Sequence, residues 1–265
     1  MYYRPEVKTA ETGGISMDYF VFGEGKKPFV MLPGLSLKKT TASAQSVAGA
    51  YREFGKDFTV YVFERKNDIE AGYSIEKMAE DTAAVMNYLG IKDAYIFGVS
   101  QGGMIAQCMA ANHPELVKKL ILASTAAQEN ENSKATFAKW ICSALKGDTR
   151  ALVGSFLDYL YSDEFLDKYK AMILNLYDGT TSDELVRFCI LAAACAGFDL
   201  SPLLRKIKCP VLVIGSKQDK IFSADDFRFL CEKTGGEIYL YKDFGHAVYD
   251  EAPDFKEHIM KFFGD

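Results

Sequence analysis

The chain has 265 residues, of which 49% are hydrophobic and 25% charged, and its formal net charge is −5. This composition is typical of a globular protein with enough apolar material for one large domain, or for a core domain that carries an insertion. The acidic balance and the lack of a basic cluster argue against nucleic acid as a partner, and no run approaches the roughly 18 apolar residues of a membrane span.

Several other classes are disfavoured by what the sequence lacks. Its start, MYYRPEVKTAETGG, has no apolar signal-peptide core, so the cytoplasm is the expected compartment. The six cysteines form no Cys-x-x-Cys pair, which indicates reduced thiols. No glycine-rich phosphate loop is present, and the three histidines have no metal-ligand spacing. We therefore expect no cofactor, no metal and no membrane or nucleic-acid partner; the oligomeric state stays open.

Up to residue 126, strand-like runs alternate with helix-like runs. ISMDYFVFG and KPFVMLPG flank the turn residues Gly23-Glu24-Gly25 and are expected to form neighbouring strands. Further strands are predicted for FTVYVFE, AYIFGV and KLILAST, and residues 74–90 carry apolar side chains at helical spacing. This rhythm predicts an α/β fold with a mainly parallel sheet covered by helices.

Residues 127–198 show only helical periodicity. Apolar stripes recur over 137–145, 152–160 and 165–176, and the spacing from Thr181 to Glu184 predicts a capping box at the start of a fourth helix. We expect a helical cap inserted into a core made of 1–126 and 199–265, where CPVLVIGS, GEIYLYK and APDFKEHIMKFF resume the alternation. Most of the stripes should pack against one another, and Trp140 and Phe156 are the candidates that face a substrate pocket below.

The segment IFGVSQGGMIAQ places Ser100 among Gly98, Gly102 and Gly103. An apolar run of strand formers precedes the serine, and residues of helix-forming composition follow it. Glycine is used where the backbone approaches another segment closely or adopts a conformation that a Cβ forbids. The pattern Gly-x-Ser-x-Gly on a strand-to-helix turn presents a serine hydroxyl at the end of a sheet, which is the position of a nucleophile.

A serine nucleophile needs a base, and the usual base is a histidine oriented by a carboxylate. Of the three histidines, His113 ends the helix after the turn and His258 lies on the polar side of the last helix. His246 instead lies in a loop after the last strand, at the edge where Ser100 is expected.

Asp219 follows the strand VLVIGS closely and is the predicted partner of His246. Asp225 and Asp226 come at the expected start of the next helix, where carboxylates meet free N–H groups, and Asp199 precedes the strand. The resulting chain order, Ser100, Asp219, His246, is that of α/β-hydrolases.

With these motifs in place, the sequence resembles the capped, cofactor-free branch of the alpha/beta-hydrolase family over nearly its whole length. The resemblance rests on GVSQGGMIAQ, PVLVIGSKQD, GHAVYDEAPDFKEHIMKFF and the helical insertion. It implies an eight-stranded type of sheet, with Ser100 as nucleophile, His246 as base and acid, and Asp219 as its orienter. The family's oxyanion hole would use the backbone N–H groups of Leu35 and Gln101.

Two segments depart from many relatives. The chain has Pro33-Gly34 where His-Gly is frequent, and FERKNDIEAG where a D-x-R-G-x-G-like loop is frequent. The serine at position 100 disfavours dehalogenases and epoxide hydrolases, which use an aspartate nucleophile. The expected activity is hydrolysis of a small or medium ester, thioester or lactone, as in the esterase and enol-lactone hydrolase branches. The alternative is a small-molecule sensor that uses the same fold with little turnover.

Overall fold

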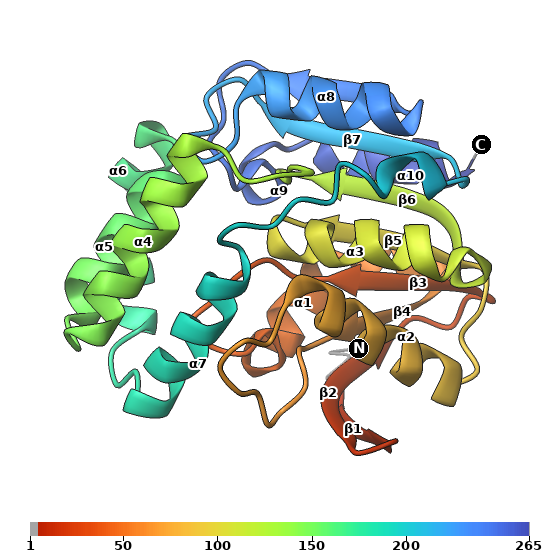
Figure 1. The fold of residues 1–265 in the computed structure, drawn as a ribbon, viewed down its shortest axis with the longest axis horizontal. Coiled ribbons are helices and arrows are strands. Elements are labelled where there is room, and N and C mark those ends of the chain that lie inside the picture. The colour runs from red at the N-terminus through yellow and green to blue at the C-terminus, as the bar shows by residue number, and fades with distance from the viewer. Residues whose placement is uncertain (1–4, 265) are drawn as a thin grey trace.

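The structure is a computed structural model that describes residues 5–264; the first four residues of the N-terminal stretch discussed above lie outside this range. It contains an eight-stranded sheet in the order β1-β2-β4-β3-β5-β6-β7-β8 (Figure 1). The strands are β1 (Val7–Thr12), β2 (Ile15–Phe22), β3 (Lys27–Leu32), β4 (Phe58–Phe63), β5 (Ala94–Val99), β6 (Val117–Ala123), β7 (Val211–Ser216) and β8 (Glu237–Tyr241). β2 pairs antiparallel with β1 and with β4, and all other pairs are parallel.

Two hydrophobic clusters hold helices against the sheet. One cluster includes buried residues of α2 (Ile75–Tyr88), α3 (Gln101–Asn112) and α8 (Ala224–Thr234). The other includes α1 (Ala44–Ala50), the short α9 (Val248–Glu251) and α10 (Phe255–Gly264). The sheet is thus covered by apolar contacts on both faces. This agrees with β5 and β7, in which every residue is buried.

The expected pairing of the two strands around Gly23-Glu24-Gly25 is wrong, because β4 lies between β2 and β3. The Glu24 and Gly25 amides bond to the carbonyls of Gly55 and Phe58, so the connection passes over the start of β4. A direct β2–β3 hairpin would run antiparallel, whereas β3 pairs parallel with β4 and β5. Sequence analysis also missed β1, which completes the antiparallel edge.

Four helices connect β6 to β7: α4 (Glu131–Leu145), α5 (Thr149–Leu160), α6 (Asp163–Leu176) and α7 (Ser182–Ala194). They stand at the left of Figure 1, beside the carboxyl ends of the parallel strands. The capping box predicted at Thr181 is confirmed, since the Glu184 amide donates to the Thr181 hydroxyl and the Glu184 carboxylate accepts from the Thr181 amide. These helices therefore lie over the edge of the sheet where strand-end loops gather.

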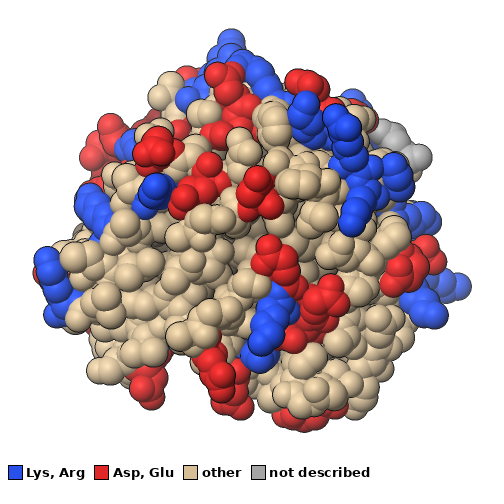
Figure 2. Space-filling view, viewed as in Figure 1, with Lys and Arg blue, Asp and Glu red and all other residues tan. Residues whose placement is uncertain are grey.

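The surface carries both signs of charge. On the face drawn in Figure 2, Asp and Glu side chains are interspersed with Lys and Arg. Within residues 5–264, no helix is both long enough and apolar enough to cross a bilayer.

Candidate active site

Ser100 lies on the turn between β5 and α3 with φ 51° and ψ −118°. This left-handed conformation is disfavoured for a residue with a side chain. The neighbouring glycines allow the turn to pack closely. A Cβ on Gly102 would lie 1.9 Å from the Leu32 carbonyl oxygen, and one on Gly103 would lie 2.6 Å from Thr125 Cγ2. The glycines around the serine are therefore needed because other segments touch the turn at those positions.

Asp219 and His246 meet in loops that follow β7 and β8. His246 Nδ1 lies 2.8 Å from Asp219 Oδ2, and the two side chains are 1% and 0% exposed. Asp219 Oδ1 accepts from the amides of Ile221 and Phe222, at 2.8 and 3.0 Å, so the carboxylate is held from both sides. An ionised carboxylate only accepts, so Nδ1 carries the proton of a neutral imidazole and Nε2 is the basic nitrogen.

Two consecutive residues after β6 link the serine turn to the histidine loop. The Thr125 hydroxyl donates to the Ser100 carbonyl at 2.8 Å, and the Ser124 hydroxyl donates to the His246 carbonyl at 2.5 Å. Ser124 itself has φ 47°. Sequence analysis missed this link; the available signal was two hydroxyl residues directly after a predicted strand at the same edge. The structure thus anchors the backbones of Ser100 and His246 to one dipeptide.

The amides of Leu35 and Gln101 lie beside the serine. Gln101 follows Ser100 directly, and Leu35 follows Gly34, where a Cβ would lie 3.3 Å from Ser100 Cβ. Among the described residues, neither amide donates a hydrogen bond to a protein acceptor. Both residues are buried. Two buried N–H donors without an internal partner are suited to an oxygen that becomes negative during a reaction.

Buried Arg65 holds this region together and was missed by the sequence analysis. Its Nη2 donates to the Pro33 carbonyl at 2.6 Å and to Gln101 Oε1 at 2.9 Å. The Gln101 amide group in turn donates to the Leu191 carbonyl at 2.6 Å and to Cys195 Sγ at 3.0 Å. Burial lowers the pKa of Arg65. The departure noted in FERKNDIEAG therefore contains a side chain that joins the Pro33 loop to Gln101, and Gln101 in turn bonds to helix α7.

A cavity of about 230 Å³ opens beside this site. Leu35 and Val99 line it from the core, and Phe156 lines it from α5. Its walls also include four tyrosines and Asp250. Ser100 is not among the lining residues, but the cavity reaches both chain segments that adjoin it.

Trp140, the second pocket residue predicted from the sequence, does not line this cavity. Its ring is 1% exposed and packs 4.7 Å from the Phe156 ring and 5.7 Å from the Phe137 ring, measured between centroids. The apolar stripe of α4 meets α5 and α7 at this point. Trp140 therefore belongs to the packing among the helices between β6 and β7.

The other predicted histidines and aspartates have local partners. His113 Nε2 lies 2.9 Å from Glu80 Oε1. The His258 ring packs against the Tyr239 ring, with 3.9 Å between the ring centroids. Asp226 accepts from the Ser223 amide at the start of α8. Asp225 pairs with Arg228 one turn later, and Asp199 accepts from the amide two residues after it. The structure brings Asp219, and none of these three, to His246.

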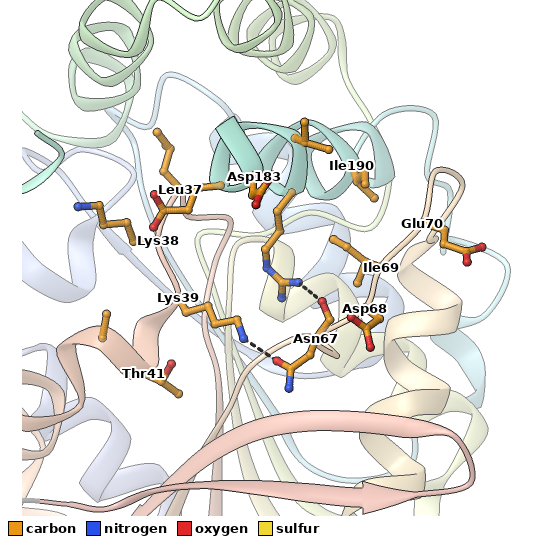
Figure 3. A pocket seen from close by; sticks show the side chains of 14 residues that line it. Leu37, Lys38, Lys39, Thr41, Asn67, Asp68, Ile69, Glu70, Asp183 and Ile190 are labelled. Atoms are coloured by element: carbon orange, nitrogen blue, oxygen red, sulfur yellow. Dashed lines mark hydrogen bonds between the residues drawn. The ribbon is translucent and has the colours of Figure 1, made fainter. Parts of the chain in front are cut away.

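A larger hollow of about 820 Å³ lies between α7 and the loops at 37–42 and 67–70 (Figure 3). Two of its cationic side chains already have partners: Lys39 bonds to Asp18 and Asn67, and Arg187 bonds to backbone carbonyls of residues 65–67. A small void of about 10 Å³ shares Leu37, Lys38, Lys39 and Arg187 with it and is also lined by Gly34. Ser100 is not among the lining residues of this hollow. No group of three or more His, Cys, Asp or Glu in residues 5–264 is arranged to hold a metal ion.

Comparison with known proteins places this geometry in context. A family model described as alpha/beta hydrolase fold matches residues 45–253. The chain is 25% identical to 3-oxoadipate enol-lactonase 2 of Acinetobacter baylyi over 251 residues, covering 93% of this chain and 92% of that protein. The crystal structure of MGS-M2, an alpha/beta hydrolase enzyme from a Medee basin deep-sea metagenome library, superposes with a TM-score of 0.87 at 24% identity, covering 97% of this chain and 98% of that one. The enol-lactonase of Burkholderia xenovorans LB400 superposes with a TM-score of 0.84 at 21% identity, covering 97% and 100%.

Proposed function

The chain belongs to the alpha/beta hydrolase family and is a hydrolase of ester or lactone type, and on this premise we propose that it works through a Ser100-His246-Asp219 triad and an acyl-enzyme. The observation that supports this most directly is the buried 2.8 Å contact between His246 Nδ1 and Asp219 Oδ2. The Ser124-Thr125 dipeptide holds the backbone of His246 and also that of Ser100, whose φ is 51°. The substrate class is a small molecule with a carboxylic ester, thioester or lactone group.

In this proposal, Ser100 Oγ attacks the substrate carbonyl while His246 Nε2 takes the hydroxyl proton. Asp219 holds the imidazole through Nδ1 and stabilises its positive charge when both nitrogens are protonated. The carbonyl oxygen becomes negative and is stabilised by the free amides of Leu35 and Gln101. Because these donors are fixed before the reaction, they need little reorganisation during it.

The tetrahedral intermediate then expels the alcohol, thiol or ring oxygen, which receives the proton from His246. Water attacks the remaining acyl-enzyme, with His246 again accepting the proton, and the carboxylic acid leaves as Ser100 recovers its proton. Each proton that His246 takes is returned in the same half-reaction, so the enzyme ends in its starting state.

We further propose that residues 127–198 act as a cap on a core of 1–126 and 199–265. Phe156 and Tyr161 of this segment line the same cavity as Leu35 and Val99, so the helices contribute to the wall of the space beside Ser100. A cap in this position limits which substrate groups fit.

Site-directed variants test the triad with p-nitrophenyl butyrate. Ser100→Ala should lose about 10⁶-fold in kcat, the order of magnitude for removal of a triad nucleophile, with circular dichroism unchanged. His246→Ala should lose activity comparably, whereas His113→Ala is the matched control and should stay near wild type. A Ser100→Ala enzyme with a tenth of the wild-type rate, or an inactive His113→Ala, would contradict the proposal.

A further inference from the structure

The cavity beside Leu35 has both apolar and polar lining residues. Met31, Val62 and Phe97 line it from the sheet. Its polar end, the name used here for Asp250 and the tyrosines at 51, 161, 177 and 249, adjoins these residues, since the Tyr51 and Phe97 ring centroids lie 6.2 Å apart. A volume of about 230 Å³ corresponds to roughly eight groups the size of water, at about 30 Å³ each. The cavity therefore has room for a small substrate group.

Asp250 offers one free carboxylate oxygen to this space. Oδ2 accepts from the Tyr161 hydroxyl at 2.9 Å, while Oδ1 has no hydrogen-bond partner among residues 5–264. Within the same range, no Lys, Arg or His forms an ion pair with it. Asp250 is exposed and is one of the residues that line the cavity, so a ligand there can contact it. A carboxylate beside the active site with no internal cation is an acceptor that a ligand can complete.

The tyrosines at this end are neutral donors. Burial, together with the charge of Asp250, raises the pKa of Tyr51, Tyr177 and Tyr249, so all three keep their proton at neutral pH. Within the described residues, their hydroxyls form no hydrogen bond. The polar end thus presents one negative acceptor and three uncommitted hydroxyls.

Asp250 and the tyrosine hydroxyls are expected to select ligands by charge and by hydrogen bonding. A carboxylate group on the ligand would meet Asp250 with like charge, and a methyl end would leave the acceptor unpaired. A hydroxyl or ammonium end donates to Oδ1 while its chain contacts the apolar floor.

We propose that this cavity is a substrate subsite for an apolar stem ending in a hydrogen-bond donor, hydroxyl or ammonium, and that Asp250 is its specificity-determining residue. The inference rests on the proposed hydrolase function and adds the chemical class of the substrate group beside the ester. The substrate is then an ester, thioester or lactone in which a short alkyl chain separates the carbonyl from the hydroxyl or ammonium group.

The competing role for Asp250 is structural, because its bond to Tyr161 joins α9 to the end of α5. The neighbouring Glu251 already makes this connection, since it accepts from the amides of Ser162 and Gly245. Tyr161→Phe removes the structural bond and leaves the Asp250 carboxylate in place. It is therefore the matched control for variants of Asp250.

The experiment compares near-isosteric esters by pH-stat titration. Methyl 6-hydroxyhexanoate is set against methyl heptanoate for an acyl group in the cavity, and 6-hydroxyhexyl acetate against heptyl acetate for an alcohol group. In one of the two pairs, the wild type should prefer the hydroxyl-ended ester in kcat/KM by about ten- to hundredfold, the range for a hydrogen bond to a charged group. Asp250→Leu should erase the preference and Tyr161→Phe should keep it.

Further measurements distinguish a hydroxyl from an ammonium ligand, and failure of the subsite from failure of the triad. Asp250→Asn keeps the shape and loses the charge, so it should lose preference for methyl 6-aminohexanoate more than for the hydroxyl ester; it also serves if Asp250→Leu does not fold. If Ser100→Ala is inactive, calorimetric binding of the same esters to it reports on the subsite without chemistry. If Ser100→Ala still hydrolyses them, the triad proposal fails and the kcat/KM preferences alone test the subsite. No preference in either pair, or a Tyr161→Phe variant that loses it as fully as Asp250→Leu, would overturn the inference.

Discussion

The conformation of Ser100 predicts that its loss can stabilise the protein. At φ 51° and ψ −118°, a residue with a Cβ carries strain of roughly 1–3 kcal/mol, which glycine relieves. Glycine also gains roughly 0.5–1 kcal/mol of entropy in the unfolded chain, which offsets part of this. Ser100→Gly should therefore be more stable than wild type by about 1 kcal/mol, or roughly 2–4 °C in Tm for a chain of this size.

Ser100→Ala is the control that separates strain from side-chain chemistry. Alanine keeps the Cβ and so keeps the strain, and the Ser100 hydroxyl caps no helix and makes no hydrogen bond within residues 5–264. Its stability should equal that of the wild type, while both variants lose hydrolysis of p-nitrophenyl butyrate. Urea denaturation and a turnover assay on the same three proteins give the answer. A Ser100→Gly variant no more stable than Ser100→Ala would refute the view that the fold holds this serine under strain.

Three further predictions concern other groups. Asp219→Asn should lower kcat by about 10⁴-fold in steady-state kinetics while Asp226→Asn stays near wild type, and the reverse result would move the acid to Asp226. Trp140→Ala should cost about 3–5 kcal/mol in denaturation experiments, because it empties the packing among α4, α5 and α7, and an unchanged midpoint would contradict this. Desolvation raises the pKa of Asp250 from 3.8 to about 6, with Glu251 adding to the rise and the Tyr161 hydroxyl opposing it. Ionisation of Asp250 therefore lowers stability as pH rises from about 4 to about 6, and no further above that. Asp250→Asn should gain Tm over wild type at pH 8 and lose that gain near pH 4; a gain independent of pH would count against the shift.

Local patterns in the sequence were enough to identify the elements around the site. The helix over 74–90, the start of α7 at Thr181 and the strand-to-helix turn at Ser100 depend on spacing, capping and glycine within a few residues. The chain order of Ser100, Asp219 and His246 also follows from which residues come after predicted strands. These features could be predicted because the interactions that produce them are short in sequence.

Pairings between distant segments could not be predicted in the same way. Nothing near Gly23-Glu24-Gly25 shows that β4 enters between β2 and β3, since that order depends on pairing with a strand more than 30 residues further along the chain, antiparallel to β2 and parallel to β3. Trp140 has the helical spacing of a pocket residue, yet which side of a stripe meets the cavity depends on how α4 packs on α5 and α7. Arg65 and Asp250 have no motif in the sequence that marks them.

The sequence by itself therefore determined most of the elements, though not β1, and the residue types that can carry hydrolysis, because periodicity, glycine placement and strand-end positions are local properties. Only the tertiary structure decided that the Asp219 carboxylate lies 2.8 Å from His246, that Arg65 joins Gln101 to the Pro33 loop, and that Asp250 and Leu35 line the same cavity. Each of these depends on segments that are far apart in the chain and are brought together by burial of the two apolar faces of the sheet.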